Sequence, residues 1–137
     1  MEYCIYRFLD INLNIIYIGK AKNLKHRLSG HRHLPTECYE NVAFIEYTQV
    51  KDINSIDFIE CYYIQRFKPK YNGSFNKNKM IYTIRELDCV KWNYLDNGTN
   101  YIRLETIKKY KEEEEKNCVY HVSQEDINRA SESFCLL

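Results

Sequence analysis

Glycine and proline are scarce in this chain, with four and two residues among 137. That scarcity excludes a collagen-like or linker-dominated protein. No apolar run approaches the roughly 18–20 residues that a membrane-spanning helix needs. The Met-Glu-Tyr-Cys start also lacks the basic and apolar segments of a secretory signal. Hydrophobic residues make up 45% of the chain and charged residues 28%, so we expect a folded, cytoplasmic or otherwise intracellular protein.

The six cysteines lack local pairing. None of them forms a Cys-x-x-Cys motif, so the close spacing that is typical of a structural zinc site is missing. Without a secretory signal, a reducing compartment is the expected environment of the chain. We therefore expect free thiols rather than a disulfide framework.

The net charge of +1 hides two basic stretches. Residues 20–33 and residues 66–79 each contain five lysines and arginines and no acidic residue, whereas residues 80–137 carry more acidic than basic side chains. Two such stretches in a nearly neutral protein indicate an anionic partner on one face, such as nucleic acid. The alternative interpretation is that both are ordinary solvated surfaces.

Runs of β-branched and aromatic residues predict three strands, at residues 3–9, 15–18 and 42–48. The first two strands are expected to pair as a hairpin, because Asp10, Asn12 and Asn14 supply turn chemistry between them. Gly19 is expected to end the second strand.

Two helices are predicted within the first half of the chain. Asn23 is a suitable N-cap for a short basic helix at residues 24–32. A second helix begins after residues 54–55, runs to Phe67 and carries an apolar stripe. Glu60 lies within that stripe, and a carboxylate that faces a core costs several kcal/mol unless it is paired or binds a metal. The alternative is that Glu60 lies at the edge of the stripe and reaches water.

The pattern is weaker from residue 80 onward. The turn signal Asp96-Asn97-Gly98 predicts a hairpin between residues 90–95 and 101–104. A highly charged helix is expected at residues 105–116, then a short strand at 118–122 and a final helix after Ser123. We therefore expect a core at residues 1–79 and an extension at residues 80–137.

An ordered set of motifs resembles the GIY-YIG nuclease family, especially the nuclease half of bacterial nucleotide-excision-repair endonucleases. The set runs over residues 3–73 and consists of Cys4-Ile5-Tyr6, Tyr17-Ile18-Gly19-Lys20, Arg27, Glu60, Pro69 and Asn72. It departs from the family at Cys4, where the family usually has glycine. The resemblance implies an α/β (α+β) fold, with a small, mainly antiparallel three-stranded sheet flanked by helices.

The resemblance also implies an activity, which is hydrolysis of DNA phosphodiester bonds by water with Mg²⁺ or Mn²⁺. In that chemistry Glu60 would hold the metal, with the DNA phosphate completing its coordination. The planar guanidinium of Arg27 would bind the scissile phosphate. His31, one helical turn after Arg27, would accept a proton or orient the attacking water.

The two motif tyrosines are expected in one cleft. A cation beside a phenol favours the phenolate, so Arg27, Lys20 and a metal are expected to lower the tyrosine pKa values. Tyr6 is then the expected general base, and Tyr17 would position water or phosphate.

Three residues are expected to support this site. Gly19 would let the backbone approach the phosphate, Lys20 would contact the phosphate or lower a phenol pKa, and Asn72 would brace the site. Other basic side chains are expected to bind the phosphates of double-stranded DNA without reading its sequence: Lys22, Lys25, Arg32, Arg66, Lys68 and Lys70.

Two other interpretations remain open. The first is a nuclease-like domain that binds DNA without cutting it, for which Cys4 in place of glycine leaves room. The second is a protein-interaction module, in which the acidic run at residues 112–115 recruits a basic partner or shields the basic face from DNA.

Overall fold

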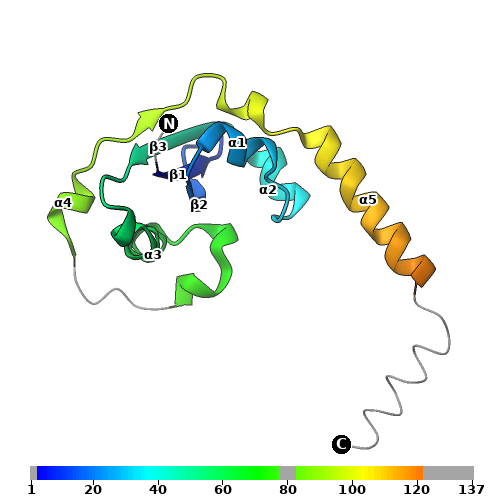
Figure 1. The fold of residues 1–137 in the computed structure, drawn as a ribbon. Helices are drawn as coiled ribbons and strands as arrows, with labels where there is room; N and C mark the ends of the chain where they lie inside the picture. Colours follow the sequence, from blue (N-terminus) through cyan, green and yellow to red (C-terminus); the bar gives the residue numbers. More distant parts are fainter. Residues whose placement is uncertain (1–2, 78–82, 122–137) are drawn as a thin grey trace, which may run out of the picture. The chain divides into compact units, whose positions relative to one another are not determined.

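The computed structural model describes residues 3–77 and 83–121, which form two compact units that divide between Arg103 and Leu104 (Figure 1). The second unit contributes helix α5 (Leu104–His121) to the described part of the chain. Within the described ranges, no helix combines the length and the apolar character that crossing a membrane requires.

A four-stranded antiparallel sheet lies at the centre of the first unit, in the order β2-β1-β3-β4. Its strands are β1 (Cys4–Leu9), β2 (Ile15–Ala21), β3 (Phe44–Gln49) and β4 (Asn93–Tyr94). The α+β architecture with flanking helices is confirmed. The two-residue strand β4 comes from beyond the expected core and adds to the three predicted strands.

The β1–β2 hairpin forms as the turn residues predicted. One carboxylate oxygen of Asp10 accepts hydrogen bonds from the backbone N–H groups of Asn12 and Asn14, both at 2.9 Å. Gly19 does not end β2, because the strand continues through Ala21. The expectation of a shorter strand was wrong because Gly19 pairs with Tyr6 of β1 and keeps the ladder intact.

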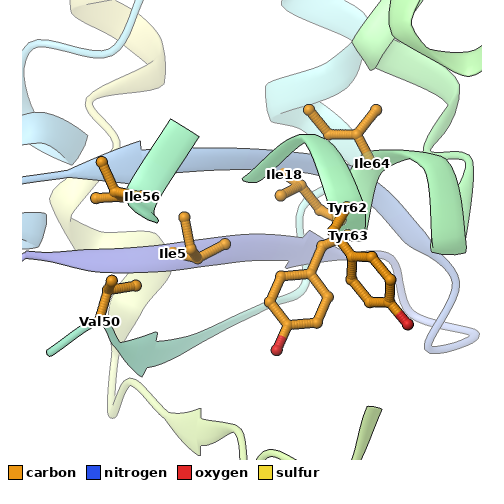
Figure 2. Packing of buried hydrophobic residues seen from close by; sticks show 7 residues of the cluster. All are labelled: Ile5, Ile18, Val50, Ile56, Tyr62, Tyr63 and Ile64. Carbon is orange, nitrogen blue, oxygen red and sulfur yellow. The ribbon is translucent and has the colours of Figure 1, made fainter. Parts of the chain in front are cut away.

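Helix α3 (Ile56–Phe67) covers one face of the sheet, as the apolar stripe predicted (Figure 2). Successive strand residues point to opposite faces, so Ile5 and Ile18 meet α3 while Tyr6 faces the other way. The core on this side is a cluster of buried side chains: Ile5, Ile18, Val50, Ile56, Tyr62, Tyr63 and Ile64.

Residues 83–103 pack onto this core and include helix α4 (Arg85–Asp88). The Tyr63 hydroxyl donates to the Leu87 carbonyl at 2.8 Å. The Arg7 guanidinium lies 4.1 Å from the centre of the Trp92 ring, a favourable cation–π contact. The first compact unit therefore ends at Arg103, whereas the sequence suggested a core ending at residue 79.

Four elements differ from the sequence-based expectation. Helix α1 (Leu24–Ser29) is shorter than predicted, because Gly30 caps it. Helix α2 (Thr36–Asn41) follows Pro35 and was not predicted. The predicted 90–104 hairpin was wrong, because the 3₁₀ helix η3 (Gly98–Tyr101) replaces its second strand. Residues 118–121 continue α5 rather than forming a strand, and the predicted final helix after Ser123 lies outside the described residues.

The first unit holds two further 3₁₀ helices, η1 (Ile53–Ser55) before α3 and η2 (Lys70–Lys77) after it. Lys68 ends α3 in the left-handed conformation, with φ 49°, and its N–H donates to the Ile64 carbonyl at 2.8 Å. This tight ending turns the chain back toward the sheet and brings Asn72 against β2.

Candidate active site

The two motif tyrosines lie side by side on the sheet face opposite α3. Tyr6 is completely buried and Tyr17 is 8% exposed, and their ring centres lie 6.1 Å apart. Phe8 packs against both rings, at 5.5 Å from Tyr6 and 5.4 Å from Tyr17. The structure therefore brings the tyrosines together, as the paired motifs predicted, and buries both of them.

His31 lies in a different place from the one we expected. It follows the end of α1 rather than extending the helix, and it is only 1% exposed. Its Nε2 atom lies 2.9 Å from the Tyr6 hydroxyl, and its Nδ1 atom lies 2.6 Å from the hydroxyl of Tyr39. The Tyr39 oxygen also accepts the Leu34 N–H at 3.2 Å. Tyr39 is thus a member of the site that the sequence pattern did not reveal.

Burial sets the protonation state of His31. It lowers the pKa of His31 to about 3, with smaller contributions from His33 and Arg27. The imidazole is therefore neutral at physiological pH, with one ring nitrogen as donor and the other as acceptor.

The tyrosine pKa values move in the opposite direction from the one we expected. Burial raises the pKa of Tyr6 and, to a lesser extent, the pKa of Tyr17. The Arg27 charge lowers both pKa values, but burial outweighs it. In the metal-free chain the desolvation of a phenolate therefore costs more free energy than the partly exposed Arg27 guanidinium recovers, so Arg27 alone does not lower the tyrosine pKa values.

Arg27 nevertheless belongs to the same site. It lies on α1 with an exposed side chain. Desolvation lowers the pKa of Arg27, but the nearby Tyr6, Tyr17 and Tyr39 more than compensate and raise it. A guanidinium that remains accessible above buried phenols is suited to bind an anion from solvent.

Glu60 lies on α3 and is linked to the site by its charge interactions. Burial raises the pKa of its carboxyl group, Lys20 and Arg27 lower it, and Asp57 raises it further. Glu60 in turn raises the pKa of Tyr17. The carboxylate therefore lies within electrostatic range of both cations and of the exposed side of the tyrosine pair.

Lys20 connects β2 to α3. It stands opposite Ile5 in the ladder and so points to the α3 face, where its ammonium group pairs with Asp57. That contact raises the pKa of Lys20, and the charges of Glu60 and Asp57 raise it further, whereas desolvation lowers it. Asp57 is a second acidic residue of the site that the sequence pattern did not identify.

A metal at this site would depend on Glu60 for its protein oxygen ligand. In the described part of the chain, no group of three or more histidine, cysteine, aspartate or glutamate side chains could hold a metal ion. A half-buried carboxylate fits a hard divalent cation, because such ions are often bound by one or two carboxylates together with substrate phosphate and water.

Asn72 braces the outer edge of β2. Its Oδ1 atom accepts the Ile18 N–H and its Nδ2 atom donates to the Ile18 carbonyl, both at 2.9 Å. The Asn72 amide thereby makes the two backbone hydrogen bonds that a neighbouring strand would make at Ile18, between Tyr17 and Gly19. These bonds hold the strand that carries Tyr17 and Gly19.

The other basic residues predicted to bind DNA lie in different environments. Lys22 and Lys25 are exposed, with their Nζ atoms 6.0 Å from the Tyr3 ring and 5.6 Å from the Tyr101 ring. Arg66 pairs with Asp88 at 3.4 Å, and Lys70 pairs with Glu37 at 3.5 Å. Exposed ion pairs of this kind contribute little energy, so both cations remain available to phosphate. Arg32 and Lys68 are also exposed.

Cys4 occupies a core position. It is fully buried opposite Ala21, and burial raises the pKa of its thiol to about 11. The thiol is therefore protonated and packs as a small apolar side chain. Cysteine in place of glycine leaves the β1–β2 ladder intact.

Residues 2–73 match the family described as "UvrC-like GIY-YIG domain". The chain belongs to this family. The UvrABC system protein C of Rickettsia canadensis is 34% identical over 73 residues, and those of Rickettsia felis and Rickettsia rickettsii are 34% and 33% identical over the same length.

The match covers 50% of this chain but only 11% of each of these relatives. No solved structure is similar enough to count as a match. Membership of the UvrC-like GIY-YIG family supports a nuclease function for the matched segment, which contains all the motif residues from Tyr6 to Asn72.

Proposed function

We propose that the chain is a metal-dependent endonuclease that hydrolyses phosphodiester bonds of double-stranded DNA. One observation carries the proposal. The Tyr17 phenol lies within electrostatic range of the Arg27 guanidinium and of the Glu60 carboxylate. A cation suited to bind phosphate and an oxygen ligand suited to hold a metal therefore both act on one phenol.

Glu60 would hold the cation, which we propose to be Mg²⁺ or Mn²⁺. The carboxylate is half-buried, and burial opposes its negative charge, so a bound cation would relieve that cost. When bound, the ion supplies Lewis-acid stabilisation of charge on the phosphate.

Arg27 would bind the non-bridging oxygens of the scissile phosphate. Its exposed guanidinium offers a planar pair of donors that matches two phosphate oxygens. The Arg27 charge also acts on Tyr6, Tyr17 and His31, so a phosphate held there would lie above the phenols.

The two tyrosines would have different roles. Tyr6 has no exposed surface and its hydroxyl is bonded to His31, so we assign it to positioning. Tyr17 retains some exposure, and the charges of both Arg27 and Glu60 act on its phenol. We therefore assign the contact with the attacking water to Tyr17, and not to Tyr6 as the sequence had suggested.

The exposed basic side chains would position the duplex through its backbone. Contacts of this kind give affinity that falls with salt and carry no sequence information. The proposed set combines both basic stretches: Lys22, Lys25, Arg32, Arg66, Lys68 and Lys70.

The test is cleavage of supercoiled plasmid DNA by the purified chain. Nicked circles should appear with Mg²⁺ or Mn²⁺ and not with a chelator. Arg27→Ala should abolish nicking, whereas Arg103→Ala, which removes an exposed arginine outside the site, should nick like the wild type. Equal nicking by the Arg27 and Arg103 variants would contradict the assignment of Arg27.

The burial of both phenols favours one alternative, a nuclease-like domain that binds DNA without cutting it. That alternative predicts salt-dependent DNA binding, measured by fluorescence anisotropy, and no nicking with any divalent metal. Nicking that requires both metal and Arg27 would exclude it.

A further inference from the structure

Two histidines on the chain segment between α1 and α2 stack against each other in different environments. The ring centres of His31 and His33 lie 4.6 Å apart, with 30° between the ring planes. His31 is buried and neutral, whereas His33 is exposed. The two stacked rings therefore differ in their access to water.

His33 is bonded to the tyrosine on the exposed side of the pair. Its Nε2 atom lies 3.2 Å from the Tyr17 hydroxyl, and the two ring centres lie 5.9 Å apart in an edge-on arrangement. His31 makes the equivalent contact with the buried Tyr6. The site thus contains two tyrosine–histidine pairs, one enclosed and one open to solvent.

We propose that His33 is a further catalytic residue, which accepts the Tyr17 hydroxyl proton while Tyr17 takes a proton from the attacking water. This inference rests on the proposed function. The Tyr17 O–H bond breaks and the His33 Nε2–H bond forms, while the water O–H bond breaks and a new Tyr17 O–H bond forms. The water oxygen forms a bond to phosphorus as the bond from phosphorus to the leaving oxygen breaks, and the leaving oxygen takes a proton from a second water. The imidazolium then gives its proton to the hydroxide that the second water leaves, which restores neutral His33.

The surroundings suit a transient positive charge on His33. His31 stacks on it as a neutral ring, and Tyr17 approaches it from β2. Arg27 and Glu60, which both act on Tyr17, are of opposite charge. The phosphate that Arg27 would bind adds negative charge on the solvent side, which favours the imidazolium.

The stack with His31 fixes the orientation of the His33 ring. His31 is itself held at both ring nitrogens, by Tyr6 and Tyr39. A ring stacked on such a fixed partner retains little rotational freedom, so its Nε2 atom stays directed at Tyr17. Orientation of the acceptor is part of what makes proton transfer efficient.

The experiment uses the full chain and combines substitution with chemical rescue. His33→Ala should slow plasmid nicking by about 10²- to 10⁴-fold, the range typical of a lost acid–base group. Because the side chain is exposed, free imidazole should enter the space and restore part of the rate. His33→Gln keeps a hydrogen-bonding side chain but no basic nitrogen, so it should be as slow as His33→Ala.

His26→Ala, on the exposed surface of α1, is the matched control and should retain the wild-type rate. Wild-type nicking together with full activity of His33→Gln would overturn the role of His33 and leave the proposed nuclease function intact. A slow His33→Ala variant that imidazole does not rescue would also overturn it. Absence of nicking by the wild-type chain with Mg²⁺ or Mn²⁺ would instead contradict the proposed function.

Discussion

The backbone of Gly19 lies directly against the phenol of Tyr6. A Cβ atom placed on Gly19 would lie 2.6 Å from both the Cζ and the hydroxyl oxygen of that ring. The two residues are ladder partners in the β1–β2 hairpin. Gly19 therefore serves the site by leaving room for a buried tyrosine, whereas the sequence suggested an exit from the strand.

Gly19→Ala should displace the Tyr6 ring and weaken its bond to His31. Because Tyr6 is fully buried, the ring has little room to move, and we expect a loss of about 1–3 kcal/mol in unfolding free energy. Chemical denaturation measures this loss. Gly30→Ala is the control, since its nearest neighbouring atom would lie 3.9 Å away. Equal stability of the two variants would show that Gly19 is not needed for packing.

Asn72→Ala should destabilise the outer edge of β2. It removes both hydrogen bonds to Ile18, and the expected loss is about 1–3 kcal/mol, because two partly buried backbone groups lose their partner. Amide hydrogen exchange at Ile18 should speed up more than exchange at Ile5 in the next strand. Asn41→Ala removes one exposed bond to the Glu37 carbonyl and should change stability little. Unaltered exchange at Ile18 would contradict the bracing role.

Stability should fall as the pH is lowered from about 6.5 toward 3. Burial lowers the pKa of His31 from 6.5 to about 3 in the folded chain. Between these values the unfolded chain binds the extra proton and the folded chain does not, so protonation favours unfolding by at most about 1.4 kcal/mol per pH unit. Denaturation at a series of pH values measures this slope. His31→Gln should reduce the slope, and His26→Gln should leave it unchanged; an identical slope in both variants would argue against a buried neutral His31.

The hairpin and the α3 stripe could be predicted from local pattern, because turn chemistry and helical spacing act over a few residues. That the motif residues share one site was expected from the resemblance to the family and not from local pattern. The position of His31 could not, because Gly30 ends α1 one residue before it. The partnership of His31 with Tyr39 and of Tyr17 with His33 also depends on tertiary packing. The raised tyrosine pKa values depend on burial. Burial is set by tertiary packing, so it could not be predicted from the sequence alone.

Glu60→Gln should make the metal-free chain more stable at neutral pH, by roughly 0.5–1 kcal/mol, as is common when a functional group is removed from an unfavourable environment. Burial raises the pKa of Glu60 above 4.5. The folded chain therefore favours the protonated carboxyl, and this favourable contribution is lost as the pH rises above 4.5 and through the folded pKa. Thermal denaturation without metal should show the gain, and Glu86→Gln, at an exposed position, should show none. A less stable Glu60→Gln chain would contradict an unfavourable charge at Glu60.

Added Mg²⁺ should make the wild type more stable than Glu60→Gln. Metal that binds the folded chain raises the melting temperature of the wild type increasingly as its concentration exceeds the dissociation constant, and Glu60→Gln should not respond. An equal rise in both proteins would place the cation elsewhere.

The most direct measurement is the single-turnover rate of plasmid nicking in Mg²⁺ by Glu60→Gln, compared with the wild type and with Glu86→Gln. If Glu60 holds the cation beside Arg27 and Tyr17, Glu60→Gln should be at least about 100-fold slower while remaining folded. Glu86→Gln should match the wild type. A Glu60→Gln chain that nicks DNA as fast as the wild type would contradict the account.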